Sequence, residues 1–134
     1  MRDEKLEQVG EPQGLWWGVD GGWVDWCGSN MPECLHPFVY EVVPPSRTLY
    51  VDTPDAYLRF AKEFAKTVHA TINVVDWHRV KGLYDGVEIA PYRYDRRFED
   101  LWYYGWDCAS GCAWRDVSYR QVASWNGSEY VLEV

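Results

Sequence analysis

Residues 102–114, Trp-Tyr-Tyr-Gly-Trp-Asp-Cys-Ala-Ser-Gly-Cys-Ala-Trp, decide most of what this sequence predicts about its fold. They hold three of the nine tryptophans and two of the four cysteines. An aromatic run interrupted by Asp-Cys-Ala-Ser-Gly is typical of two strands that meet at a tight turn, because aromatic residues favour strands and Asp, Ser and Gly favour turns. We therefore expect a strand over 101–106, a turn over 107–111 and a strand over 112–117. A ligand-binding cleft at this turn is a reasonable hypothesis.

The segments on either side of this stretch also favour strands. On the carboxyl side, residues 119–125 and 128–134 flank Asn126-Gly127, which is a strong signal for a two-residue hairpin. On the amino side, residues 87–90 form an apolar strand after a turn, and a long loop continues through residue 99.

The first third of the chain predicts three strands and a short helix. Residues 15–18, Leu-Trp-Trp-Gly, are a short apolar segment bounded by glycine and indicate a strand. Trp23, Trp26 and Cys27 are spaced i, i+3 and i+4, which places them on one face of a short helix. Residues 38–43 and 48–52 are rich in strand-forming residues, and we expect them to pair with each other antiparallel.

The middle of the chain predicts two helices. Thr53 is a favourable N-cap and Pro54 suits the first helical position, so a helix begins here. Its apolar residues recur at helical spacing and predict a helix over about 54–68. Asp76 is the expected cap of a second, shorter helix. Strands, then helices, then strands indicate an α+β fold with a mostly antiparallel sheet and two or three helices. We expect one domain over 12–134, after a flexible charged segment over 1–11.

Composition limits the classes of partner and the compartment. The formal net charge is −8, which argues against a protein that binds duplex nucleic acid, because contact with phosphates needs clustered Lys and Arg. No apolar run reaches the length of a membrane span, and the first residues lack the apolar stretch of a signal peptide. We therefore expect a cytoplasmic protein with reduced thiols. The cysteine spacings are not those of a zinc site, although His36 near Cys34 leaves that alternative open.

The tryptophans at the two ends of the sequence have two interpretations. They build an aromatic core, or two or three of their rings enclose a flat ligand such as a nicotinamide, a nucleobase or a sugar face. Glycines among them would let the backbone approach that ligand closely. On the second interpretation, the candidate ligand-binding residues are Trp16, Trp17, Gly18, Tyr92, Trp106, Asp107 and Ser110.

Few side chains suit catalysis. Glu88 is the candidate catalytic residue, because it alone is charged in an apolar strand; the alternative is an edge-strand residue that faces water. Asp107 is expected to accept hydrogen bonds from turn amides. Two such carboxylates beside a sugar bond could hydrolyse a glycoside. Ser110 and Cys108 are candidate nucleophiles, but no histidine pattern supplies a base.

Three blocks together resemble a family of small bacteriophage and bacterial proteins. The blocks are residues 14–26, which contain Gly-Leu-Trp-Trp and end in Trp-Val-Asp-Trp, residues 84–89, Tyr-Asp-Gly-Val-Glu-Ile, and residues 102–114. The resemblance spans about residues 12–116. It implies no particular activity; our hypothesis for a phage-type protein is that it works in the host cytoplasm.

Residues 15–18 also resemble, more distantly, the first strand of the ADP-ribosyltransferase fold, a split antiparallel sheet that clamps NAD. That strand often reads Leu-Trp-His-Gly, and here Trp17 replaces the histidine that would contact the nicotinamide ribose. No Glu-x-Glu pair is present, although Glu88 could stand for the transferase glutamate. The resemblance thus implies a shared fold with lost or altered chemistry.

These observations lead to three functional hypotheses. The first is a binding protein that uses the aromatic cleft for a host protein or a small molecule, without a cofactor. The second is an NAD-dependent ADP-ribosyltransferase, in which Trp17 and Tyr92 stack on nicotinamide, Glu88 holds the ribose and Ser110 positions it. The third is a carbohydrate-binding module.

Overall fold

The computed structural model describes residues 11–69 and 72–133 of the chain. It confirms the expected α+β class: three α-helices and mostly antiparallel strands, split over three sheets, occur among the described residues. Of the segment expected to be flexible, residues 1–10 lie outside this part of the chain.

The largest sheet has four strands in the order β1-β7-β6-β3. Its strands are β1 (Leu15–Gly18), β7 (Ser110–Ala113), β6 (Gly86–Ile89) and β3 (Thr48–Val51). The first three pair antiparallel, and β3 runs parallel to β6. The sheet therefore joins the two ends of the sequence, because β1 lies beside β7.

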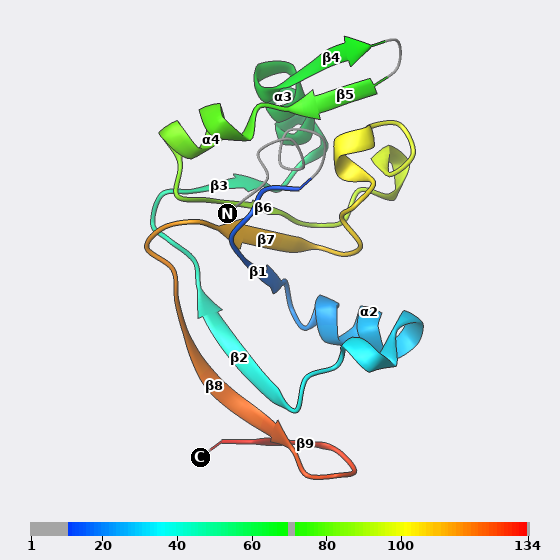
Figure 1. Ribbon diagram of the computed structural model, residues 1–134, viewed down its shortest axis with the longest axis vertical. Coiled ribbons are helices and arrows are strands. Elements are labelled where there is room, and N and C mark those ends of the chain that lie inside the picture. Colours follow the sequence, from blue (N-terminus) through cyan, green and yellow to red (C-terminus); the bar gives the residue numbers. More distant parts are fainter. Residues whose placement is uncertain (1–10, 70–71, 134) are drawn as a thin grey trace.

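Two smaller sheets extend from this one. The strands β2 (Phe38–Val43), β8 (Ser118–Trp125) and β9 (Tyr130–Leu132) form an antiparallel sheet, which we call the arm. The strands β4 (Ala65–His69) and β5 (Ile72–Val75) form a hairpin. Figure 1 shows the hairpin on one side of the four-stranded sheet and the arm leading away on the other side.

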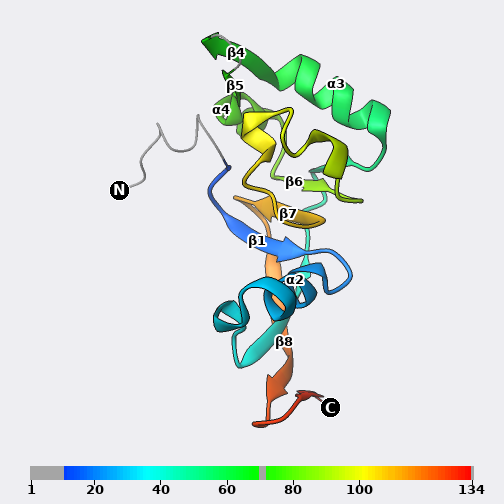
Figure 2. The same ribbon diagram turned by 90° about the vertical axis from the view of Figure 1, so that its right-hand side faces the viewer.

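The helices are α2 (Gly22–Asn30), α3 (Pro54–Phe64) and α4 (Trp77–Leu83). Short 3₁₀ turns occur at η1 (Pro32–Cys34), η2 (Tyr94–Arg96) and η3 (Leu101–Tyr103). Helices α3 and α4 lie on the same side of the four-stranded sheet as the β4–β5 hairpin, and α2 lies beside β1 near the arm (Figures 1 and 2).

The hydrophobic core lies between the four-stranded sheet and helices α3 and α4. One face of the sheet contributes Val51, Val87 and Ile89, all nearly inaccessible to solvent. Aromatic side chains fill the rest, and burial of such large apolar surfaces is the main stabilising contribution. The buried aromatic residues of this cluster are Tyr57, Phe60, Phe64, Trp77, Trp102, Tyr103 and Trp106.

The prediction of an antiparallel pair between residues 38–43 and 48–52 is wrong. Strand β2 pairs with β8, whereas β3 pairs parallel with β6. The link between them contains Pro44 and Pro45, which lack amide donors and cannot form a tight hairpin turn. It carries the chain from one sheet to the other.

Helix α3 begins where the sequence predicts and ends earlier. The Thr53 hydroxyl accepts a hydrogen bond from the amide of Ala56 at 3.0 Å. The helix stops at Phe64, and the residues to 69 form β4 instead of a last helical turn. The carbonyl of Phe64 accepts the amide of Asp76 at 2.8 Å, so the next element satisfies the helix end.

The aromatic strand expected over 101–106 is also wrong. Residues 101–103 form η3, and the chain turns again before Trp106. Trp102, Tyr103 and Trp106 are buried while Tyr104 is exposed, a spacing of i, i+1 and i+4 that suits a helical turn and not a strand. Strand β7 occupies 110–113, so residues 107–111 are not simply a turn and 112–117 are not one strand.

The remaining predicted elements are present. Strand β1 occupies residues 15–18, and α2 contains the predicted helical face. Asp76 caps α4 by accepting the amide of Arg79 at 3.2 Å. Strands β8 and β9 flank Asn126-Gly127, and the Asn126 side chain accepts the amides of both Ser128 and Glu129 at 2.9 Å.

Candidate functional site

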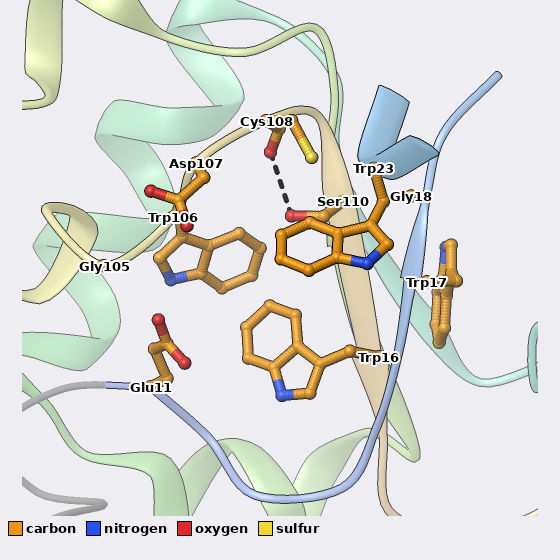
Figure 3. A pocket seen from close by; sticks show the side chains of 10 residues that line it. All are labelled: Glu11, Trp16, Trp17, Gly18, Trp23, Gly105, Trp106, Asp107, Cys108 and Ser110. Carbon is orange, nitrogen blue, oxygen red and sulfur yellow. Dashed lines mark hydrogen bonds between the residues drawn. The ribbon is translucent and has the colours of Figure 1, made fainter. Parts of the chain in front are cut away.

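A cavity of about 280 Å³ lies where β1, the start of β7 and α2 meet. Figure 3 shows the rings of Trp16, Trp23 and Trp106 gathered around it, with the carboxylates of Glu11 and Asp107 at one side. Its volume is close to the lower end of the range for ligand pockets, which is enough for a single ring. The lining residues are Glu11, Trp16, Trp17, Gly18, Trp23, Gly105, Trp106, Asp107, Cys108 and Ser110.

Three indole rings form the walls of this cavity. Trp16 and Trp106 meet edge to face, with 4.8 Å between ring centroids. Trp23 on α2 is 42% exposed and stacks on Trp26 at 5.3 Å. Gly18 lets β1 approach α2, because a Cβ there would lie 2.6 Å from the Trp23 amide nitrogen. The wall is therefore buried at Trp106 and accessible at Trp23.

The cavity has an acidic side. Partial burial, and then the nearby Asp107 carboxylate, raise the pKa of Glu11 above its ordinary value. A ligand that carries a positive charge or donates hydrogen bonds would relieve this repulsion. The carboxylates and the π-faces of the indoles favour the same kind of ligand, because a ring face attracts cations.

The described part of the cavity offers no activated nucleophile. The hydroxyl of Ser110 donates to the carbonyl of Cys108 at 2.9 Å and is buried. Burial, together with the charge of Asp107, raises the pKa of the Cys108 thiol to about 11, so the thiolate is scarce at neutral pH. The arrangement suits binding better than covalent catalysis.

Trp17 and Glu88 lie on the opposite face of the four-stranded sheet. Successive side chains of a strand point to opposite faces, and Figure 3 shows the Trp17 ring on the other side of β1 from the three rings of the cavity. The indole N–H of Trp17 donates to Glu88 Oε1 at 2.9 Å. Between them in the register is Gly111, where a Cβ would lie 2.3 Å from the Trp17 ring. The ring thus crosses β7 at the one position without a side chain.

Tyr92 packs behind the cavity and does not line it. Its hydroxyl donates to the carbonyl of Trp106 at 2.5 Å, and its ring stacks on Tyr103 at 5.4 Å. It holds the segment that carries Trp106.

The structure brings the side chains or backbone of five sequence-predicted ligand residues to one cavity, namely Trp16, Gly18, Trp106, Asp107 and Ser110. Trp17 belongs to the lining, but its ring is on the other side of β1 (Figure 3). The structure leaves Glu88 and Tyr92 outside the lining. Sequence reasoning missed Glu11, which belongs to the segment expected to be flexible. No local signal identifies Glu11, because its place depends on a contact with Gly105, over which its carboxylate lies.

No group of three or more potential metal ligands occurs among the residues that the structure describes. In the same part of the chain, no helix is long and apolar enough to cross a membrane.

Comparison with family models, curated proteins and solved structures finds no match for this chain. The resemblances to a bacteriophage family and to the ADP-ribosyltransferase fold therefore stay predictions from the sequence.

Proposed function

We propose that this is a phage-type binding protein of the host cytoplasm whose cavity holds one flat ring. The observation that carries the proposal is the cavity itself: three indole walls and two carboxylates surround about 280 Å³. The ring belongs to a small molecule or to a side chain of a host protein. The same indoles would recognise either, because stacking depends on the ring and not on the rest of the molecule that bears it.

The ADP-ribosyltransferase hypothesis has less support. It needs Trp17, Tyr92, Glu88 and Ser110 around one nicotinamide. Trp17 and Glu88 share one sheet face, Ser110 is on the other, and the Tyr92 hydroxyl is bonded to a backbone carbonyl. Nothing observed among the described residues favours a sugar over a flat aromatic ring as the ligand.

A ligand titration tests the small-molecule form of the proposal. Nicotinamide, adenosine, NAD, ADP-ribose and glucose are each added at millimolar concentration, and the melting temperature and tryptophan fluorescence are followed. Binding to the folded state raises the melting temperature. We expect a ring compound to do so, and Trp23→Ala to weaken it by about 2- to 10-fold, which corresponds to the loss of one aromatic contact.

Trp125→Ala is the matched control, because Trp125 is exposed to a similar degree, 46%, and lies outside the cavity. To test whether the ring belongs to a host protein, the wild type and Trp23→Ala are each used to capture proteins from host lysate. The proposal fails if no compound binds and every retained host protein is retained equally by the two baits. Release of nicotinamide from NAD would instead favour the transferase.

A further inference from the structure

A second, larger hollow lies on the other side of β1. It is an open groove of about 800 Å³ between the four-stranded sheet, α2 and the arm. Figure 1 shows the loop after α2 leading into β2 and the arm leading away from the four-stranded sheet. The groove includes the face that bears Trp17 and Glu88. It adjoins the cavity around Trp106 and shares Trp16, Trp17, Gly18 and Trp23 with its lining, but not Trp106 or Asp107.

The charge of this groove has one sign. Its lining contains the carboxylates of Asp20, Glu41 and Glu88, and no lysine or arginine among the described residues. Glu41 has an exposed ion pair with Arg120 at 3.4 Å, a weak contact in water. The lining histidine, His36, accepts the amide of Phe38 at Nδ1. The groove is therefore complementary to a cation.

Glu88 is the best placed of the three carboxylates. It is half-buried at the centre of the sheet face, and its Oε1 accepts the Trp17 indole N–H. Its other oxygen has no hydrogen-bond partner among the described residues. A half-buried carboxylate with one oxygen fixed and the other available can bind a donor without rearrangement, which lowers the entropic cost of binding.

Aromatic side chains line the same groove as this carboxylate. Tyr40 and Tyr119 meet edge to face at 5.7 Å on the two paired strands of the arm. They are 45% and 59% exposed, so both rings are accessible to a ligand. Trp17 supplies a third ring, held flat across Gly111. Such rings attract a cation through their π-faces, and a guanidinium also stacks on them.

We propose that this groove binds an arginine side chain of a basic partner segment. The guanidinium pairs with the available Glu88 oxygen and stacks on the rings, and a neighbouring basic residue of the partner meets Asp20. Arginine fits better than lysine because its planar fork donates to a carboxylate and stacks at once. This site goes beyond the proposed function, since it uses the opposite face of β1.

The test is a titration of labelled hexa-arginine into the full chain, followed by fluorescence anisotropy, with hexalysine as the comparison. We expect hexa-arginine to bind more tightly than hexalysine. Glu88→Gln should weaken it by about two- to fivefold. The glutamine carbonyl can still accept the Trp17 N–H, so the fold is retained. Tyr119→Ala, at an exposed position, should weaken it by a similar factor.

Glu129→Gln is the matched control, since it removes the same charge from an exposed turn outside the groove. Asp107→Asn changes the cavity around Trp106, and we expect it to weaken hexa-arginine binding less than Glu88→Gln does. Equal weakening by Glu88→Gln and Glu129→Gln would overturn the site in favour of attraction by net charge alone. Equal affinity for hexalysine, or no binding, would also overturn the proposal.

Discussion

At the scale of single residues, Gly111 permits the contact between Trp17 and Glu88. It is the central position between Trp17 and Glu88, and the indole occupies the space where any other residue would place its Cβ. The absence of one side chain therefore permits a hydrogen bond between side chains that lie two strands apart.

We predict that Gly111→Ala lowers the free energy of unfolding by about 1–3 kcal/mol, the usual effect of overpacking. The added methyl group would force the Trp17 ring away from β7 and break its bond to Glu88. Urea unfolding followed by fluorescence measures the change. Gly82→Ala in α4 is the control: nothing lies within 4 Å of a Cβ there, so we expect no loss, and a helical alanine stabilises by up to about 1 kcal/mol. Equal stability of Gly111→Ala and the wild type would refute the packing argument.

The sequence identified both partners of this contact but not the contact. Trp17 was notable as a tryptophan in a glycine-bounded strand, and Glu88 as a charge in an apolar strand. Their meeting depends on the register of β1, β7 and β6, which joins residues 71 positions apart. Local patterns carry no information about such a register.

At the scale of elements, a buried carboxylate fixes the loop between β6 and β7. Asp100 accepts hydrogen bonds from the Tyr57 hydroxyl at 2.6 Å and the Asn73 amide at 2.9 Å. Arg96 forms an ion pair with it at 3.0 Å. The loop that carries Trp102 and the cavity wall is thereby attached to α3 and β5.

We predict that Tyr57→Phe lowers the free energy of unfolding by about 1.5–3 kcal/mol at neutral pH, because a hydrogen bond to a charged group is lost. Tyr94→Phe is the control, since Tyr94 is 75% exposed. If Tyr57→Phe lowers the free energy of unfolding no more than Tyr94→Phe does, the hydrogen bond between Tyr57 and Asp100 does not contribute to stability.

The same residue predicts a pH dependence. Burial, and then the bond to Asp100, raise the pKa of Tyr57 above its ordinary value. The unfolded tyrosine ionises near pH 10, whereas the folded one keeps its proton, so the stabilising contribution is complete below about pH 10 and is lost above it. The wild type should therefore lose stability more steeply above pH 10 than Tyr57→Phe. Parallel pH profiles from chemical denaturation would contradict this.

Elements with local signals were predictable, and strand partners were not. The start of α3 is explained by Thr53 and Pro54, and the β8–β9 hairpin by Asn126-Gly127. The end of α3 depends on Asp76 and the β4–β5 hairpin, and η3 depends on the burial of rings that a strand would have pointed to opposite faces. The predicted end of α3 and the predicted strand over 101–106 are both wrong because tertiary contacts override local preference there.

At the scale of the whole molecule, the core and the arm differ in how they are held together. The residues of the buried cluster come from the four-stranded sheet, α3, α4, β5 and the loop before β7; none of the described members belongs to β2, β8 or β9. The arm instead exposes large apolar side chains, among them Phe38, Val43 and Leu132. Its stability depends mainly on strand pairing, and a small sheet with both faces accessible is weakly stabilised.

We predict that the arm opens locally while the core stays folded. In native-state hydrogen exchange, amides of β2 and β8 should have protection factors at least about a hundredfold lower than those of β6 and β7. Amides of β6 and β7 should exchange only by global unfolding, which exposes much surface, so low concentrations of urea should accelerate their exchange. The same urea should change exchange in the arm little, because local opening exposes little surface. Equal protection in both regions, with the same urea dependence, would mean that arm and core unfold as one unit. In that case the groove between them would be a rigid recess and not a surface with one mobile wall.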